Sequence, residues 1–323
     1  MRDVALVGLA GSGKSTVFTA VSGHVPQRGS NAPVAVVSVP DPRVDKLAEI
    51  YRSKKTTYAQ LEVVDVAGLD PHSLGAARTA DALAIVLRAF GDDVDIARDL
   101  SSFRAELAVA DLSTVEKVRD RATKQAKAGS PLELEVAELA EAALSDGHWL
   151  SEVDWTDEQR QAVGLWTPLT MKPALHVINA DDALPDQPGT FVPSVALLGA
   201  VEAEATELPA EESRELLGEY EITEPAAERF VRVAYEAMGL ITFLTGNQEE
   251  ARAWEIPRGA TAPQAAGAIH TDLERGFIRA ERVSFADLVQ AGSYEAARER
   301  GLVRVEGKEY IVNDGDYLAI LHS

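Results

Sequence analysis

Near its N-terminus the chain reads Val4-Ala5-Leu6-Val7-Gly8-Leu9-Ala10-Gly11-Ser12-Gly13-Lys14-Ser15-Thr16. An apolar strand, a glycine-rich loop and then a helix starting at Lys14 form the order that the P-loop pattern G-x-x-x-x-G-K-[ST] requires. Glycines let the backbone curl so that successive N–H groups point at one phosphate, and the positive end of the helix adds to this attraction. We therefore predict a site for a nucleoside triphosphate.

Each position of this loop has an expected part in holding the phosphates. Lys14 is predicted to reach the β- and γ-phosphates as a catalytic residue, and the hydroxyl of Ser15 is predicted to bind Mg²⁺. The residues of the loop that we expect to contact nucleotide are Gly8, Ala10, Gly11, Ser12, Gly13, Lys14, Ser15 and Thr16. An ordinary glycine-rich turn is the alternative, and the complete motif in this context disfavours it.

A second motif, Asp65-Val66-Ala67-Gly68, ends the apolar run that begins at Leu61. In P-loop proteins such an aspartate supports Mg²⁺ and the glycine N–H meets the γ-phosphate, so Asp65 is a predicted metal residue and Gly68 a predicted catalytic one. Leu69 stands where many GTPases place the glutamine that orients the attacking water. Hydrolysis would then be slow, use another group such as His72, or need a partner.

The strand Pro173–Ile178 leads into Asn179-Ala180-Asp181-Asp182, where a base-recognition loop is expected. A guanine-specific loop reads Asn-Lys-x-Asp, and here Ala180 replaces the lysine while Asp182 keeps an acid. Asn179 and Asp182 are predicted nucleotide contacts, and the loop alone leaves the identity of the base open. A further strand, 192–198, is followed by Gly199 and Ala200, which we expect to form a second wall of the base pocket.

The remaining periodicities predict two additions to this α/β core. Apolar residues recur at helical spacing over 96–122 and again over 132–143, with a break at Gly129-Ser130-Pro131, which predicts an antiparallel helical hairpin. Residues 209–238 are expected to be helical. After Leu240 the pattern changes to short strands around one helix that Thr261 caps and Gly276 ends, with a hairpin joining 303–305 to 310–312 and a last strand over 317–321. This region resembles a β-grasp module.

Composition limits the classes of function. The 323 residues carry a formal net charge of −21, which argues against broad nucleic-acid binding, and we expect no direct contact with DNA. The sequence has no cysteine, which excludes disulfides and thiol catalysis. We expect neither a signal peptide nor a membrane span, and a cytoplasmic location.

Taken together, these residues resemble the YchF-type proteins, which are Obg-like ATPases within the P-loop GTPase class. Besides the two motifs above, the resemblance rests on Pro40–Arg43, Glu106–Leu112, Arg252–Trp254, Ile256–Gly267, Ile269–Asp272, Gly276–Ala280 and Glu306–Val312. It implies an α/β P-loop NTPase fold, with a mostly parallel sheet flanked by helices, an inserted helical hairpin and a C-terminal β-grasp (TGS) domain. The implied nucleotide domain spans 1–92 and 168–238, the hairpin 93–167 and the TGS domain 239–323.

The resemblance also implies ATP and ADP as ligands with ATP preferred over GTP, Mg²⁺-dependent hydrolysis, and a partner among ribosomes or translation factors reached through the hairpin and the TGS domain. The chain departs from the family pattern at Ala10-Gly11-Ser12, where the family has Pro-Asn-Val, and in its shorter switch loops. The family usually has glutamate where Asp182 stands, and this difference makes GTP a candidate nucleotide again. Two functions therefore stay open, a slow ATPase acting as a switch and a non-hydrolysing adaptor stabilised by nucleotide.

Overall fold

The computed structural model describes residues 1–26, 32–70, 73–125, 131–184 and 193–323. The chain forms two compact units and contains two six-stranded sheets. The first contains residues 2–36 and 62–234, and we call it the P-loop unit. The second contains Met1, residues 37–61 and residues 235–323, and we call it the C-terminal unit.

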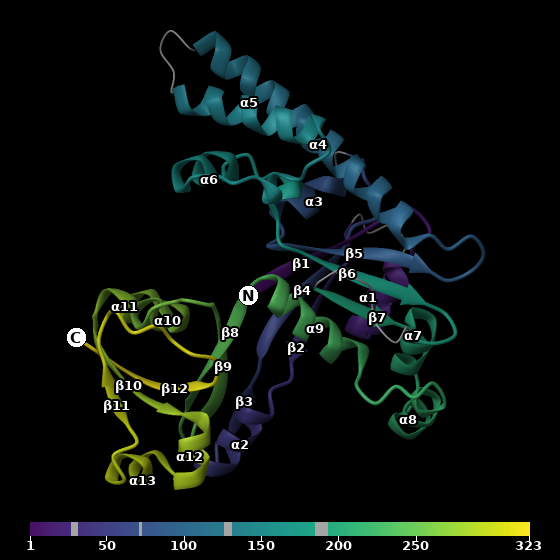
Figure 1. Cartoon of the computed structure of the whole chain (residues 1–323). Coiled ribbons are helices and arrows are strands. Elements are labelled where there is room, and N and C mark those ends of the chain that lie inside the picture. Colours follow the sequence, from purple (N-terminus) through teal and green to yellow (C-terminus); the bar gives the residue numbers. More distant parts are fainter. Residues whose placement is uncertain (27–31, 71–72, 126–130, 185–192) are drawn as a thin grey trace. The chain divides into compact units, whose positions relative to one another are not determined.

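The first sheet has the strand order β2-β4-β1-β5-β6-β7 (Figure 1). The pairs β1·β5, β5·β6 and β6·β7 are parallel. Its strands are β1 (Arg2–Val7), β2 (Val34–Val39), β4 (Ala59–Asp65), β5 (Ala82–Ala89), β6 (Ala174–Ala180) and β7 (Ser194–Leu197). The central strands are continuous apolar runs because helices cover both of their faces. This arrangement confirms the predicted P-loop NTPase architecture with its mostly parallel sheet.

Helices pack around this sheet and extend from it. They are α1 (Lys14–Ser22), α3 (Ser73–Thr79), α4 (Ile96–Gln125), α5 (Pro131–Ser145), α6 (Asp157–Gly164), α7 (Gly199–Glu207), α8 (Ala210–Glu219) and α9 (Ala226–Ala237). One apolar core joins β1 and β5 to α3 and α4, with Phe103 and Leu107 fully buried in it. The helix predicted over 209–238 is interrupted, since α8 ends at Glu219 and α9 starts at Ala226.

The inserted hairpin consists of α4 and α5, which lie side by side (Figure 1). Arg119 pairs with Glu141 and Arg121 with Glu133, so the numbering runs in opposite directions along the two helices, as in an antiparallel pair. A separate apolar core, which includes Val115 of α4, holds the two helices and α6 together. The predicted turn at Gly129 and Ser130 lies outside the described residues.

The C-terminal unit contains a mixed sheet with the order β11-β10-β12-β8-β9-β3. Its strands are β3 (Lys55–Thr57), β8 (Leu240–Gly246), β9 (Glu250–Pro257), β10 (Phe277–Ser284), β11 (Arg304–Glu306) and β12 (Asp316–His322), and its helices are α2 (Pro42–Tyr51), α10 (Ala262–Ile269), α11 (Thr271–Arg275), α12 (Phe285–Ala291) and α13 (Tyr294–Glu299). The pairs β8·β9, β10·β11 and β10·β12 are antiparallel, whereas β12·β8 and β3·β9 are parallel. Ala265 of α10 is buried on this sheet among Phe243 and Leu318, as expected for a β-grasp fold.

Two local predictions in this unit are wrong. Residues 303–305 and 310–312 do not form a hairpin, because β11 pairs with β10 and Ile311 forms only a single bridge to Thr261. The helix predicted from Thr261 to Gly276 is broken at His270, whose extended backbone ends α10 and whose side chain caps α11.

Residues 37–61 belong to the C-terminal unit, although their position in the sequence suggested the nucleotide domain. The Arg43 guanidinium donates to Asp41, to Asp314 at 2.8 Å and to the Thr242 hydroxyl at 2.7 Å. The strand β3 adds to the sheet edge beside β9. These long-range contacts, which the sequence order does not reveal, hold residues 37–61 in the C-terminal unit. The predicted functional domain boundaries stay a prediction. In the described part of the chain, no helix combines the length and apolar character needed to cross a membrane.

Candidate functional site

Three glycines give the loop between β1 and α1 a backbone path that other residues would strain. Gly8, Gly11 and Gly13 have φ values of +153°, +79° and +85°. A Cβ on Gly8 would lie 2.5 Å from the Val86 carbonyl oxygen, so the loop has no room for a side chain there. The sequence therefore produces the curled backbone that P-loop chemistry requires.

Helix α1 starts at Lys14 with an N-terminus suited to an anion. Its first turn has no acidic residue, and Gly13 provides no side chain to cap the free N–H groups. The Lys14 ammonium donates to the carbonyl oxygens of Gly8 at 3.1 Å and Leu9 at 3.2 Å, which keeps it over the loop. Burial lowers the pKa of Lys14, while the nearby charge of Asp65 opposes that shift. The lysine gains from an added anion, because such a charge offsets the cost of its desolvation.

The two predicted metal residues lie in contact. The Ser15 hydroxyl donates to Asp65 Oδ2 at 2.7 Å, although fifty positions separate the residues in sequence. Asp65 is only 4% exposed, and its Oδ1 atom is buried without a hydrogen-bond partner among the described residues. Burial raises the pKa of Asp65, with the Ser15 hydrogen bond and the Lys14 charge opposing.

A hydroxyl and a carboxylate with one unpaired oxygen fit Mg²⁺, which uses one or two protein oxygens and completes its shell with phosphate and water. Among the described residues, no three His, Cys, Asp or Glu side chains gather into a metal cluster. A divalent cation at Ser15 and Asp65 would therefore take most of its ligands from the nucleotide and from water. A cavity of about 580 Å³ lies beside these two residues and is also lined by Thr16, Pro33 and Ala67.

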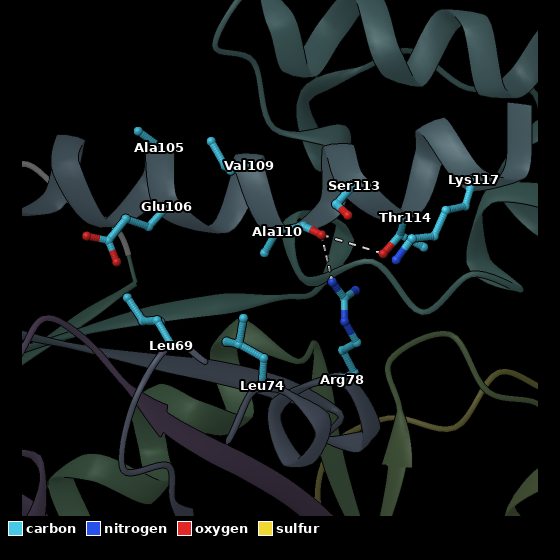
Figure 2. A pocket seen from close by; sticks show the side chains of 10 residues that line it. All are labelled: Leu69, Leu74, Arg78, Ala105, Glu106, Val109, Ala110, Ser113, Thr114 and Lys117. Carbon is cyan, nitrogen blue, oxygen red and sulfur yellow. Dashed lines mark hydrogen bonds between the residues drawn. The ribbon is translucent and has the colours of Figure 1, made fainter. Parts of the chain in front are cut away.

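Gly68 follows β4 by three residues and leads into Leu69, whose side chain is partly buried. Leu69 packs against the core and lines a groove with Leu74 of α3, as Figure 2 shows. The apolar side chain of Leu69 can neither donate a hydrogen bond to water nor accept one from it. His72, the alternative group for orienting water, lies outside the described residues.

Asn179, predicted to contact the base, is only 3% exposed and braces two loops. Its Nδ2 donates to the Ser12 carbonyl at 3.0 Å, and its Oδ1 accepts from the Gly199 N–H at 3.2 Å. A Cβ on Gly13 would lie 2.2 Å from Asn179 Nδ2, and one on Gly199 would lie 2.3 Å from its Oδ1. The structure thus brings Asn179, the P-loop and Gly199 together, and the sequence did not reveal this bracing role.

The other predicted base residues are placed differently. Asp182 is exposed, and its N–H donates to Asp181 Oδ1 at 3.1 Å. Ala200 is exposed in the first turn of α7, next to the buried Gly199. Glu202, also buried, accepts from the Leu198 N–H at 2.8 Å and so fixes the start of this helix.

The parallel sheet, the glycine loop with Lys14 and Ser15, and the aspartate at the end of β4 define a P-loop NTPase-class protein. Comparisons with known proteins identify the family. A model named YchF-GTPase_C, described as "Protein of unknown function (DUF933)", matches residues 240–322. The "Ribosome-binding ATPase YchF" of Escherichia coli O157:H7 is 37% identical over an alignment of 357 positions that covers 98% of both chains.

More distant relatives also align with nearly the whole chain. The protein of the same name from Bacillus subtilis (strain 168) is 35% identical over 97% of both chains. "Obg-like ATPase 1" of Oryza sativa subsp. japonica is 32% identical, over 98% of this chain and 90% of its own. The solved structure of the Schizosaccharomyces pombe YchF GTPase superposes with a TM-score of 0.81 at 29% identity, covering 99% of this chain and 97% of that one. The chain belongs to the YchF family.

Proposed function

We propose that the chain is a slow, Mg²⁺-dependent ATPase whose nucleotide state controls its engagement with a ribosome- or translation-linked partner. The observation that carries this proposal is the contact between Ser15 and Asp65, with Asp65 Oδ1 buried and without a hydrogen-bond partner among the described residues. A buried carboxylate oxygen without a hydrogen bond costs free energy, so this oxygen is best explained as part of a binding site for a ligand.

In this proposal, the residues of the loop divide the work on the triphosphate. Lys14 and the first N–H groups of α1 bind the β- and γ-phosphates, and Gly68 meets the γ-phosphate through its N–H. Mg²⁺, held through Ser15 and Asp65, would neutralise charge that develops on the phosphates. Leu69 offers no hydrogen bond to an attacking water, which supports a low intrinsic rate.

ATP rather than GTP is proposed from the base loop. Ala180, which replaces the lysine of a guanine-specific loop, is only 7% exposed and offers no cation to cover the ring. Asn179 uses one of its two amide hydrogens on Ser12 and accepts from Gly199, so it does not by itself favour either base. The relatives named ATPases are consistent with this preference, and a GTP-using member of the same class is the alternative.

The partner and the functional segments are also proposals. The names of the bacterial relatives include ribosome binding. We propose a ribosomal partner, and hence a cytoplasmic location, with contacts made by the hairpin (93–167) and the TGS-like region (239–323) and nucleotide held by 1–92 with 168–238. Co-sedimentation with ribosomes at several salt concentrations tests this, because electrostatic contacts weaken with salt and this chain is acidic overall. No pelleting with any nucleotide at any salt concentration would refute the partner proposal.

A phosphate-release assay with ATP and with GTP tests the activity. Wild-type protein should release phosphate faster from ATP, and Lys14→Ala should abolish the release. Lys46→Ala is the matched control, since Lys46 forms an exposed ion pair with Glu49 in the C-terminal unit. Equal background release by wild type and Lys14→Ala, with tight nucleotide binding by wild type, would favour the alternative function, a non-hydrolysing adaptor.

A further inference from the structure

Asp111 is a fully buried carboxylate in the middle of α4. It accepts hydrogen bonds from the N–H groups of Leu169 at 3.1 Å and Thr170 at 2.8 Å, and from the Thr170 hydroxyl at 2.9 Å. Arg78 of α3 donates to it at 2.8 Å. One side chain of the hairpin therefore joins α3 and the turn Leu169–Met171, which precedes β6.

Arg78 is bound on more than one side. Its Nη1 also donates to the Thr167 carbonyl and its Nη2 to the Ala110 carbonyl, both at 3.1 Å. A planar guanidinium with several fixed donors holds direction as well as distance, which a lysine ammonium would not do. The last turn of α3 is thus fixed to α4 at Arg78.

The first turn of α3 is fixed instead to the segment that follows Gly68. The Asp70 carbonyl accepts from the Leu74 N–H at 2.9 Å, and its carboxylate accepts from the Ser73 N–H at 3.2 Å. A displacement of the Gly68–Asp70 segment would therefore move this end of α3 while Arg78 holds the other end.

Between these two attachments, α3 and α4 enclose an open groove of about 620 Å³. Figure 2 shows Leu69 and Leu74 facing α4 across it, with Arg78 reaching the Ala110 carbonyl at one end. Val109 on the α4 side is 67% exposed. The lining residues are Leu69, Leu74, Arg78, Ala105, Glu106, Val109, Ala110, Ser113, Thr114 and Lys117.

We propose that the Arg78–Asp111 pair is a pivot that couples the segment after Gly68 to the hairpin, so that the width of this groove follows the bound nucleotide. The inference rests on the proposed nucleotide function. The groove leaves room for Leu69 to approach Val109, and that approach would bury apolar surface. Coupling requires two arrangements of α3, and a short helix fixed at Arg78 and moved at Ser73 would supply the second one.

Because the chain has no cysteine, one engineered thiol can report on the groove without interference. Val109→Cys carries an environment-sensitive bimane label, and its emission is compared with Mg-ADP and with a non-hydrolysable ATP analogue. Leu139→Cys on α5, also exposed, is the control label site. We expect a shift between the two nucleotides at position 109 and none at position 139.

In the labelled Val109→Cys protein, the further substitution Arg78→Met should remove the emission shift between the two nucleotides. Calorimetry should show that both nucleotides still bind. Arg119→Met removes a different ion pair, the one with Glu141 within the hairpin, and should keep the shift. If Arg78→Met does not fold, Arg78→Lys serves, and it should at least halve the shift because it loses the forked donors.

Three results would overturn the pivot. They are an unchanged shift in the Arg78 variants, a shift lost equally in Arg119→Met, and no shift in wild type with both nucleotides bound. If neither nucleotide binds to wild type, the calorimetry shows that the proposed function itself has failed, and the pivot fails with it.

Discussion

Replacing Asn179 by alanine tests whether one buried amide holds the nucleotide loops in place. The side chain bridges the Ser12 carbonyl in the P-loop and the N–H of Gly199 at the start of α7. Alanine cannot form either hydrogen bond. It also leaves space beside Gly13 and Gly199, which both lie against this amide.

The expected loss of stability follows from these contacts. Each hydrogen bond contributes about 0.5–1.5 kcal/mol, and a buried group left unpaired costs about 1–3 kcal/mol. Water entering the vacated space would restore part of this. We therefore expect Asn179→Ala to lower the free energy of unfolding of the P-loop unit by roughly 2–4 kcal/mol and to weaken nucleotide binding at least tenfold.

Urea unfolding followed by tryptophan fluorescence measures the first effect, since Trp149, Trp155 and Trp166 all lie in this unit. Asn247→Ala is the matched control. The Asn247 side chain also accepts from two backbone N–H groups, at Glu249 and Glu250, but it lies in the C-terminal unit. A loss below about 1 kcal/mol, or a loss of nucleotide affinity as large in Asn247→Ala, would contradict the bracing role.

Three further changes follow from the same geometry. Gly8→Ala should lower the free energy of unfolding in urea by about 1–3 kcal/mol, since the added methyl would lie 2.5 Å from the Val86 carbonyl oxygen. Gly75→Ala should cause no such loss, because the space around Gly75 is open. Asp65→Asn should weaken Mg²⁺-dependent ATP binding in a magnesium titration. Without Mg²⁺ and nucleotide, however, it should raise the urea midpoint at pH 7, because burial raises the pKa of Asp65 and penalises its charge, and this gain should shrink as pH falls through that pKa. Burial, and to a smaller degree the charge of Arg104, lowers the pKa of His176 to about 4. As the pH falls from 6.5, the histidine is therefore protonated in the unfolded chain before it is protonated in the folded one. The free energy of unfolding of wild type should therefore fall by up to about 3 kcal/mol between pH 6.5 and 4. That of His176→Gln should fall by less. Equal dependence of the two unfolding free energies on pH would refute this.

The sequence predicted the local structure around the P-loop well because glycines, caps and apolar runs act over a few residues. Helix α1 begins at Lys14, as predicted, and Gly23 with φ +69° follows it. The pairing of Ser15 with Asp65 could be anticipated from the motif order, since Asp65 ends β4 and Ser15 comes shortly after the neighbouring strand β1.

What the sequence could not provide depends on contacts between distant residues. Nothing local indicates that Arg43 binds Asp314 or that β3 pairs with β9, so residues 37–61 were expected in the other unit. Likewise β11 pairs with β10 because strand pairing is set by the whole sheet, not by the nearest turn. The bracing by Asn179 has a partial signal, since glycine stands at both 13 and 199, but their approach to one amide is visible only in the fold.

Equilibrium binding of ATP with and without Mg²⁺, measured by calorimetry for wild type and Lys14→Ala, tests the central claim most directly. The claim is that the loop at residues 8–16 holds a Mg²⁺-bound triphosphate through Lys14, Ser15 and Asp65. Wild type should bind ATP more tightly with Mg²⁺ than without it, and Lys14→Ala should lose at least tenfold in affinity while still unfolding in one cooperative urea transition. Equal affinities for the two proteins, or a wild-type affinity indifferent to Mg²⁺, would contradict the account.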